Sequence, residues 1–138
     1  MDQKLTALSN VPLFAGCVTK EMTVIGRLAD EVSVPAGKVL AKEGSSAHEF
    51  FVIVEGSIDI SKKGKVVRTL GPGDFFGELA MLGKVPRTAT ATAATPTRLL
   101  VLGHREFTTL LADHPGIQQK VLRTVAGWVA ASAPDRAT

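Results

Sequence analysis

The chain has 138 residues, of which 45% are apolar, and it carries a formal net charge of +3. This length and composition suit one domain with a single core, so we expect residues 1–138 to fold as one unit. The single cysteine, Cys17, excludes a disulfide framework and a four-thiolate metal site within one chain. No apolar run approaches the roughly 18 residues of a membrane-spanning helix, and the polar start is unlike a secretory signal. We therefore expect a soluble, cytoplasmic domain.

Residues 1–30 are predicted to be helical. Leu5 and Leu8 share one short apolar face before Pro12 interrupts the segment. A second helix is expected with Thr19 as its N-cap, because a threonine hydroxyl accepts a bond from the first free N–H groups of a helix. Its apolar face is formed by Met22, Ile25, Leu28 and Ala29.

Residues 31–103 contain short apolar runs with a period of two, as in Phe50, Val52 and Val54. Many short strands separated by turn residues predict a sandwich or barrel, here a jelly-roll-like β-roll. The basic cluster Lys62-Lys63-Gly64-Lys65 is interpreted as a hairpin tip, where lysines keep an edge strand soluble. A nucleic-acid patch is less favoured, because no aromatic residues or recognition helix accompany the lysines.

Residues 104–133 return to a helical pattern. Phe107, Leu110 and Leu111 form one apolar face, and Pro115 suits the first turn of a second helix. The whole chain therefore predicts an α+β fold, with a β-roll flanked by helices at both ends. The apolar stripe of the last helix consists of Ile117, Val121, Val125 and Val129.

The segment 71–90 combines a tight turn with the groups that bind a phosphate. Residues 77–82 suit one or two helical turns, whose free N–H groups attract an anion. Arg87 follows, and a guanidinium grips a phosphate through two parallel hydrogen bonds. Glu78 would repel a phosphate, so its natural partner is a ribose hydroxyl. The segment predicts a receptor for a sugar phosphate, most simply a nucleotide with one phosphate.

The sequences Phe76-Gly77-Glu78-Leu79-Ala80 and Pro86-Arg87-Thr88-Ala89-Thr90 resemble the phosphate-binding cassette of the cyclic nucleotide-binding domain family. That family includes the bacterial catabolite activator protein, the regulatory subunit of protein kinase A and cyclic-nucleotide-gated channels. The resemblance implies that Glu78 holds the ribose 2′-hydroxyl and that Arg87 holds the cyclic phosphate. The other ligand-binding residues that it implies are Gly77, Leu79, Thr88 and Ala89.

The resemblance also implies that residues 104–133 are a hinge helix and a lid helix that closes over the bound base. Arg123 is a candidate to stack on the purine, and Trp128 is a candidate to cap it. A helical stripe is more often part of a core or a dimer seam, and the apolar last helix could equally be a dimer seam or an intramolecular lid. The expected ligand is cAMP rather than cGMP, although Thr88 weakens that preference, because a threonine there is associated with cGMP in some relatives.

The sequence favours a sensor over a metal-dependent enzyme. His48, His104 and His114 form no pair at a metal-ligand spacing, which argues against a metal-dependent cupin enzyme. We see no catalytic machinery in the sequence, and expect no metal and no cofactor other than the cyclic nucleotide.

Two alternatives stay open: an interaction domain that kept the roll but lost the ligand, and a regulatory fragment of a larger enzyme, channel or transporter. The chain ends soon after Pro115, so a DNA-binding regulator with a helix-turn-helix domain is not favoured. The expected partner is a protein or an effector domain in cis, and the oligomeric state is open.

Overall fold

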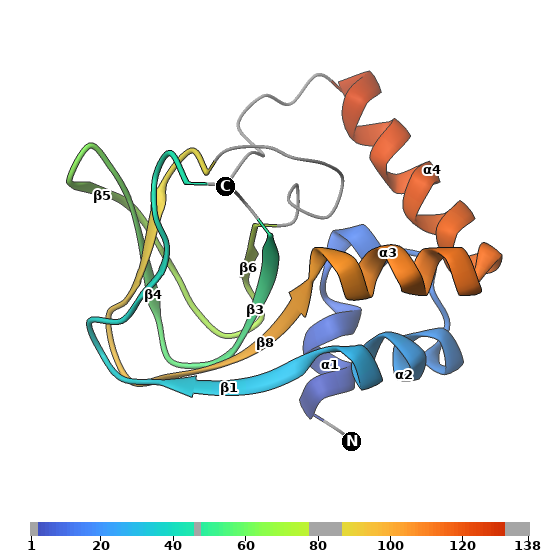
Figure 1. The fold of residues 1–138 in the computed structure, drawn as a ribbon, viewed down its shortest axis with the longest axis horizontal. Coiled ribbons are helices and arrows are strands. Elements are labelled where there is room, and N and C mark those ends of the chain that lie inside the picture. Colours follow the sequence, from blue (N-terminus) through green and yellow to red (C-terminus); the bar gives the residue numbers. More distant parts are fainter. Residues whose placement is uncertain (1–2, 46–47, 78–86, 132–138) are drawn as a thin grey trace.

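Two antiparallel sheets form a roll, and helices gather at one end of it (Figure 1). The structure is a computed structural model that describes residues 3–45, 48–77 and 87–131. The predicted α+β class with a β-roll flanked by helices is confirmed. No helix within the described ranges has the length and apolar character needed to cross a lipid bilayer.

The elements follow the order that the sequence predicts, with helices first, strands next and helices last. The helices are α1 (Gln3–Ser9), the 3-10 turn η1 (Pro12–Phe14), α2 (Thr19–Leu28), α3 (His104–Asp113) and α4 (Pro115–Ala131). The strands are β1 (Asp30–Val34), β2 (Val39–Ala41), β3 (Glu49–Glu55), β4 (Ile58–Lys62), β5 (Lys65–Leu70), β6 (Phe75–Phe76), β7 (Thr90–Ala93) and β8 (Thr97–Gly103).

The strand order is β1-β8-β3-β6 in one sheet and β2-β7-β4-β5 in the other. Successive residues of a strand point to opposite faces, so Phe50 and Phe51 of β3 belong to different cores. Phe51 packs inside the roll with Ile53, and Phe50 packs outside it against Phe14. The inner core consists mainly of Phe51, Ile53, Ile58, Ile60, Leu70, Phe76, Ala91 and Leu99, and the outer core of Phe14, Ile25, Phe50, Leu100, Leu102, Phe107, Leu110, Ile117 and Val121.

The N-terminus of α2 differs from the prediction. Thr19 is the first helical residue and not the N-cap, which is Val18. The carboxylate of Glu21 accepts the backbone N–H of Val18 at 2.9 Å, and also a hydrogen bond from Lys120 Nζ of α4 at 2.5 Å. The Lys120 bond, followed by the Val18 bond, lowers the pKa of Glu21 below its ordinary 4.5. A carboxylate three residues into the helix therefore replaces the expected hydroxyl cap and ties α2 to α4.

The last helix begins at Pro115, as predicted. Helix α4 packs on η1 and on α3, and Figure 1 shows it leading away from the two sheets. Ile117 and Val121 are buried in that contact. Val125 and Val129 continue the predicted stripe, but their side chains are not among those that the structure describes.

A sharp test of the roll is the turn between β3 and β4, where Gly56 has φ +99°. A Cβ there would lie 2.6 Å from the carbonyl oxygen of Pro96, whereas a Cβ on Gly37, at φ +89°, meets nothing within 4 Å.

We expect Gly37→Ala to lower the free energy of unfolding by about 1–2 kcal/mol through backbone strain alone. Gly56→Ala should lower the free energy of unfolding by about 3 kcal/mol or more, because the backbone at Pro96 must also move. Urea denaturation measures both, and equal losses would contradict this packing.

Candidate functional site

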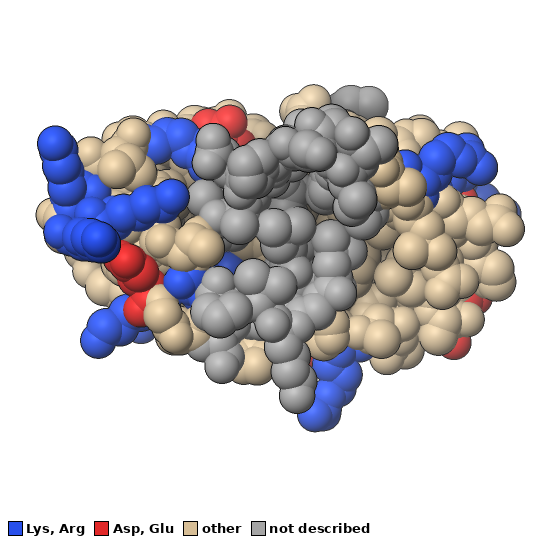
Figure 2. All heavy atoms as spheres, turned by 90° about the horizontal axis from the view of Figure 1, so that it is seen from above, with Lys and Arg blue, Asp and Glu red and all other residues tan. Residues whose placement is uncertain are grey.

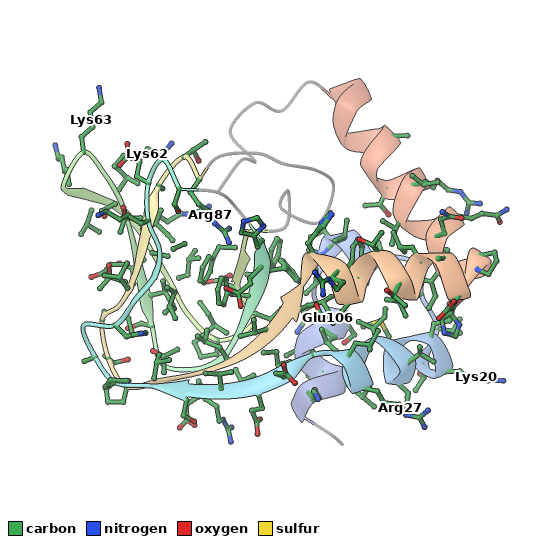
Figure 3. The ribbon with its side chains drawn as sticks, viewed as in Figure 1. Lys20, Arg27, Lys62, Lys63, Arg87 and Glu106 are labelled. Carbon is green, nitrogen blue, oxygen red and sulfur yellow. The ribbon has the colours of Figure 1, made fainter. Side chains whose placement is uncertain are left out.

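Arg87 lies at one end of the roll, where the described chain resumes after residue 77. Its backbone is held by the loop that follows β2. The N–H of Gly44 donates to the carbonyl of Arg87 at 2.8 Å, and the N–H of Arg87 donates to the carbonyl of Ser45 at 2.8 Å. This pair of bonds fixes the point from which the arginine side chain enters the roll (Figure 3).

The guanidinium of Arg87 is buried, and the residue is only 7% exposed. Its Nη2 donates to the backbone carbonyl of Glu49 at 2.7 Å. Its central carbon stands 5.9 Å from the ring centroid of Phe51, within cation–π range. Its Nη1 is buried without a hydrogen-bond partner among the described residues. One face of this cation is thus held by the roll, and one donor is left unsatisfied.

Gly77 explains how the backbone comes so close to this cation. It adopts φ +81°, a conformation that favours glycine, and it is buried. A Cβ on this residue would collide with Nη1 of Arg87 and would lie 2.7 Å from the carbonyl oxygen of Glu49. The resemblance assigned Gly77 a ligand contact, and the structure adds that only glycine leaves room for the guanidinium.

Burial lowers the pKa of Arg87, and the nearby carboxylate of Glu49 partly opposes this shift. An arginine remains charged even so, because its ordinary pKa lies far above neutral pH. A buried charge with an unsatisfied donor is costly unless an anion comes to it. The arrangement therefore suits a phosphate or carboxylate ligand.

The structure gathers only some of the predicted site residues. Thr88 is exposed and Ala89 is buried, both directly after Arg87. Glu78 and Leu79 lie outside the described residues. Arg123 is exposed on α4, and Trp128 belongs to the same helix, but its side chain is outside the description.

Two residues at the site, and a third on the neighbouring face of β5, were not found from the sequence. Glu49 contributes through its carbonyl, and Phe51 supplies a ring beneath the guanidinium, roles that no side-chain motif reveals. Arg68 of β5 is paired with Ile60 of β4. Directly opposed residues of an antiparallel pair point to the same face, so Arg68 shares the inner face of its sheet with Ile60.

A separate cavity of about 440 Å³ lies where β3, β8 and α3 meet. Its lining includes His48, Glu49, His104 and Glu106, so it brings together two histidines that are far apart in the sequence. The backbone N–H of His104 donates to the carbonyl of His48 at 2.8 Å. Within the described ranges, no three histidine, cysteine or acidic side chains come together as metal ligands.

Comparison with known proteins decides the family. Residues 31–114 match the family described as "Cyclic nucleotide-binding domain". The chain belongs to this family. The matched residues run from the second residue of β1 to the end of α3 and include Arg87.

Individual relatives agree with this assignment. A putative potassium channel protein of Rhodopseudomonas palustris is 36% identical over 124 residues, which are 87% of this chain and 30% of that protein. A cAMP-dependent protein kinase regulatory subunit of Mycosarcoma maydis is 35% identical over 129 residues, 87% of this chain and 25% of that protein.

A solved structure, the N-terminal domain of a transcriptional regulator from Streptomyces coelicolor, superposes with a TM-score of 0.86 at 28% identity. The match covers 96% of this chain and 98% of that one. The two curated relatives are regulators or channels by name, and this chain spans only 25–30% of their length.

Proposed function

We propose that this domain binds a cyclic purine nucleotide through Arg87 and acts as the regulatory part of a larger response. The first candidate ligand is cAMP, which the name of the kinase regulatory subunit contains. The effector is a protein, or a further domain in cis, because the related proteins are several times longer than this chain. No catalytic step is proposed.

The observation that carries this proposal is the unsatisfied Nη1 of Arg87 in a buried guanidinium. The roll supplies one carbonyl and one aromatic ring to this cation, and a cyclic phosphate would supply the missing acceptor. Glu78 would then accept the ribose 2′-hydroxyl, as the family's cassette implies. An interaction domain without a ligand has no use for this buried donor.

The first experiment is calorimetric titration of the purified chain with cAMP and with cGMP. We expect saturable one-to-one binding. Arg87→Lys keeps the buried charge but removes the two-pronged geometry, so it should weaken binding by about 10- to 100-fold, the equivalent of one charge-assisted hydrogen bond of roughly 1.5–3 kcal/mol.

Arg27→Lys is the matched control, because Arg27 is exposed on α2 and Figure 3 shows it pointing away from the roll. It should bind as the unchanged protein does. Folded protein that gives no heat with either nucleotide would favour the interaction domain. Equal affinity of Arg87→Lys and the unchanged protein would show that Arg87 does not bind the phosphate.

The second candidate ligand is cGMP, and Arg68 favours it. Arg68 is exposed on β5, and its pairing with Ile60 puts it on the same face of the sheet as Ile60 and Ala91 of the inner core. A guanidinium donates two hydrogen bonds to O6 and N7 of guanine, whereas adenine presents an amino donor in place of O6. The exposed hydroxyl of Thr88 adds a second polar group beside Arg87.

Replacement of this arginine tests the base preference. If Arg68 contacts guanine, Arg68→Met should weaken cGMP binding by about tenfold or more, the range for one two-pronged base contact, and leave cAMP binding nearly unchanged. The ratio of the two affinities, from the same calorimetric titrations, is the measurement. A constant ratio would exclude Arg68 from base recognition, whatever the absolute affinities.

We further propose that ligand binding closes the C-terminal helices over the site. In the structure, α4 packs on η1 and α3, and the hydrogen bond from Lys120 to Glu21 holds it against α2. Movement of α4 toward the cassette breaks this bond. Because the pKa of Glu21 is lowered, the bond contributes above pH 4.5 and is lost as the pH falls through the lowered pKa.

Removal of the bond should therefore favour closure. Lys120→Met is expected to raise nucleotide affinity by up to about fivefold at neutral pH, since a partly exposed pair of this kind is worth little more. Lys20→Met, an exposed lysine of α2, is the control and should change nothing. Weaker binding by Lys120→Met would show that the bond belongs to the closed state instead.

A further inference from the structure

The hairpin of β4 and β5 carries a basic surface that the nucleotide site does not use. Lys62, Lys63 and Lys65 are all exposed. Figure 2 shows blue side chains gathered at the left end of the molecule, over this hairpin. Figure 3 shows Lys63 pointing away from the body of the domain. We call these three lysines the hairpin cluster.

The tip that presents the cluster is held in one conformation. Lys63 and Gly64 have φ +52° and +80°, which suits the tight turn of a two-residue hairpin. The N–H of Lys63 donates to Oε1 of Glu43 at 3.0 Å, which fixes the tip to the loop after β2. A lysine in this left-handed conformation costs about 1–2 kcal/mol, and glycine or asparagine would fit better. The charge at the tip is therefore kept in spite of its conformational cost.

Strand β5 is also an edge. Its neighbour in the sheet is β4, and no other described strand pairs with it. Every second residue of such a strand presents its N–H and C=O away from the sheet. Val66 and Val67 are 53% and 55% exposed. The register between β4 and β5 shifts here, so Val67 has no residue opposite.

We propose that the free edge of β5 binds an extended acidic segment of a partner protein, which adds a strand to the sheet β2-β7-β4-β5. The backbone of such a segment pairs with β5, and alternate side chains cover Val66 and Val67. The carboxylates of the segment pair with the hairpin cluster, and this attraction orients the segment as it binds. The hairpin cluster consists of side chains other than Arg87, although the tip and Arg87 both bond to the loop after β2.

Other occupants explain fewer of these observations. A lipid surface or a nucleic acid would account for the lysines, but neither pairs with a strand edge or covers two valines. Protection of the edge against aggregation also accounts for the lysines, yet it would be better served without two half-exposed valines beside them. The acidic strand accounts for the charge, the edge and the valines together.

The probe is a short synthetic peptide in which glutamate alternates with valine and threonine, titrated into the purified chain. We expect saturable binding that slows amide hydrogen exchange in β5 and not in β1, the edge strand of the other sheet. Lys62→Glu/Lys63→Glu should weaken binding by about tenfold or more, because it replaces attraction by like-charge repulsion. Its affinity for cyclic nucleotide should stay unchanged.

The matched control is Lys20→Glu/Arg27→Glu, which changes the net charge equally but on the exposed side of α2. It should bind the peptide as the unchanged protein does. Equal weakening by the two variants, or no saturable binding, would overturn the proposal. So would binding to phosphatidylserine vesicles or to a DNA duplex as tight as to the peptide, without protection of the β5 amides.

Discussion

The buried guanidinium of Arg87 is the constraint on which the rest of this site depends. A charge inside the roll requires acceptors, and the carbonyl of Glu49 provides one at 2.7 Å. It requires space, which Gly77 leaves by having no side chain. The backbone of Arg87 must be held in place, and the two backbone hydrogen bonds to Gly44 and Ser45 do this. These groups leave Nη1 without a hydrogen-bond partner among the described residues, and this is the donor that we propose a ligand meets.

Strand β3 connects this cation to the helices. Phe51 lies beneath the guanidinium inside the roll, and its neighbour Phe50 faces the outer core. There Phe14 of η1 contacts Phe50 and Phe107 of α3, with ring centroids 6.3 Å apart in each pair. Phe14, Phe50 and Phe107 therefore join β3 to the helices that precede the roll and to those that follow it.

Much of the fold followed from local patterns. The change from helical to alternating periodicity placed the roll, and Pro115 marked the start of α4. The lysine cluster marked the β4–β5 tip. The prediction at Thr19 was wrong by one residue: the N-cap is Val18, whose N–H bonds to the carboxylate of Glu21, and that carboxylate also gains Lys120. A contact 99 residues away in sequence is invisible to a local rule.

The amino-acid sequence was enough to identify the family, because two motifs, residues 76–80 and 86–90, resemble the family's phosphate-binding cassette. The tertiary structure adds that Arg87 is buried, that its Nη1 has no hydrogen-bond partner among the described residues, and that the carbonyl of Glu49 accepts a bond from its Nη2. The physical reason is that burial, backbone acceptors and strand register arise from segments distant in the chain. A linear pattern records which groups are present, and the packing of β3, β4 and β5 determines which of them meet.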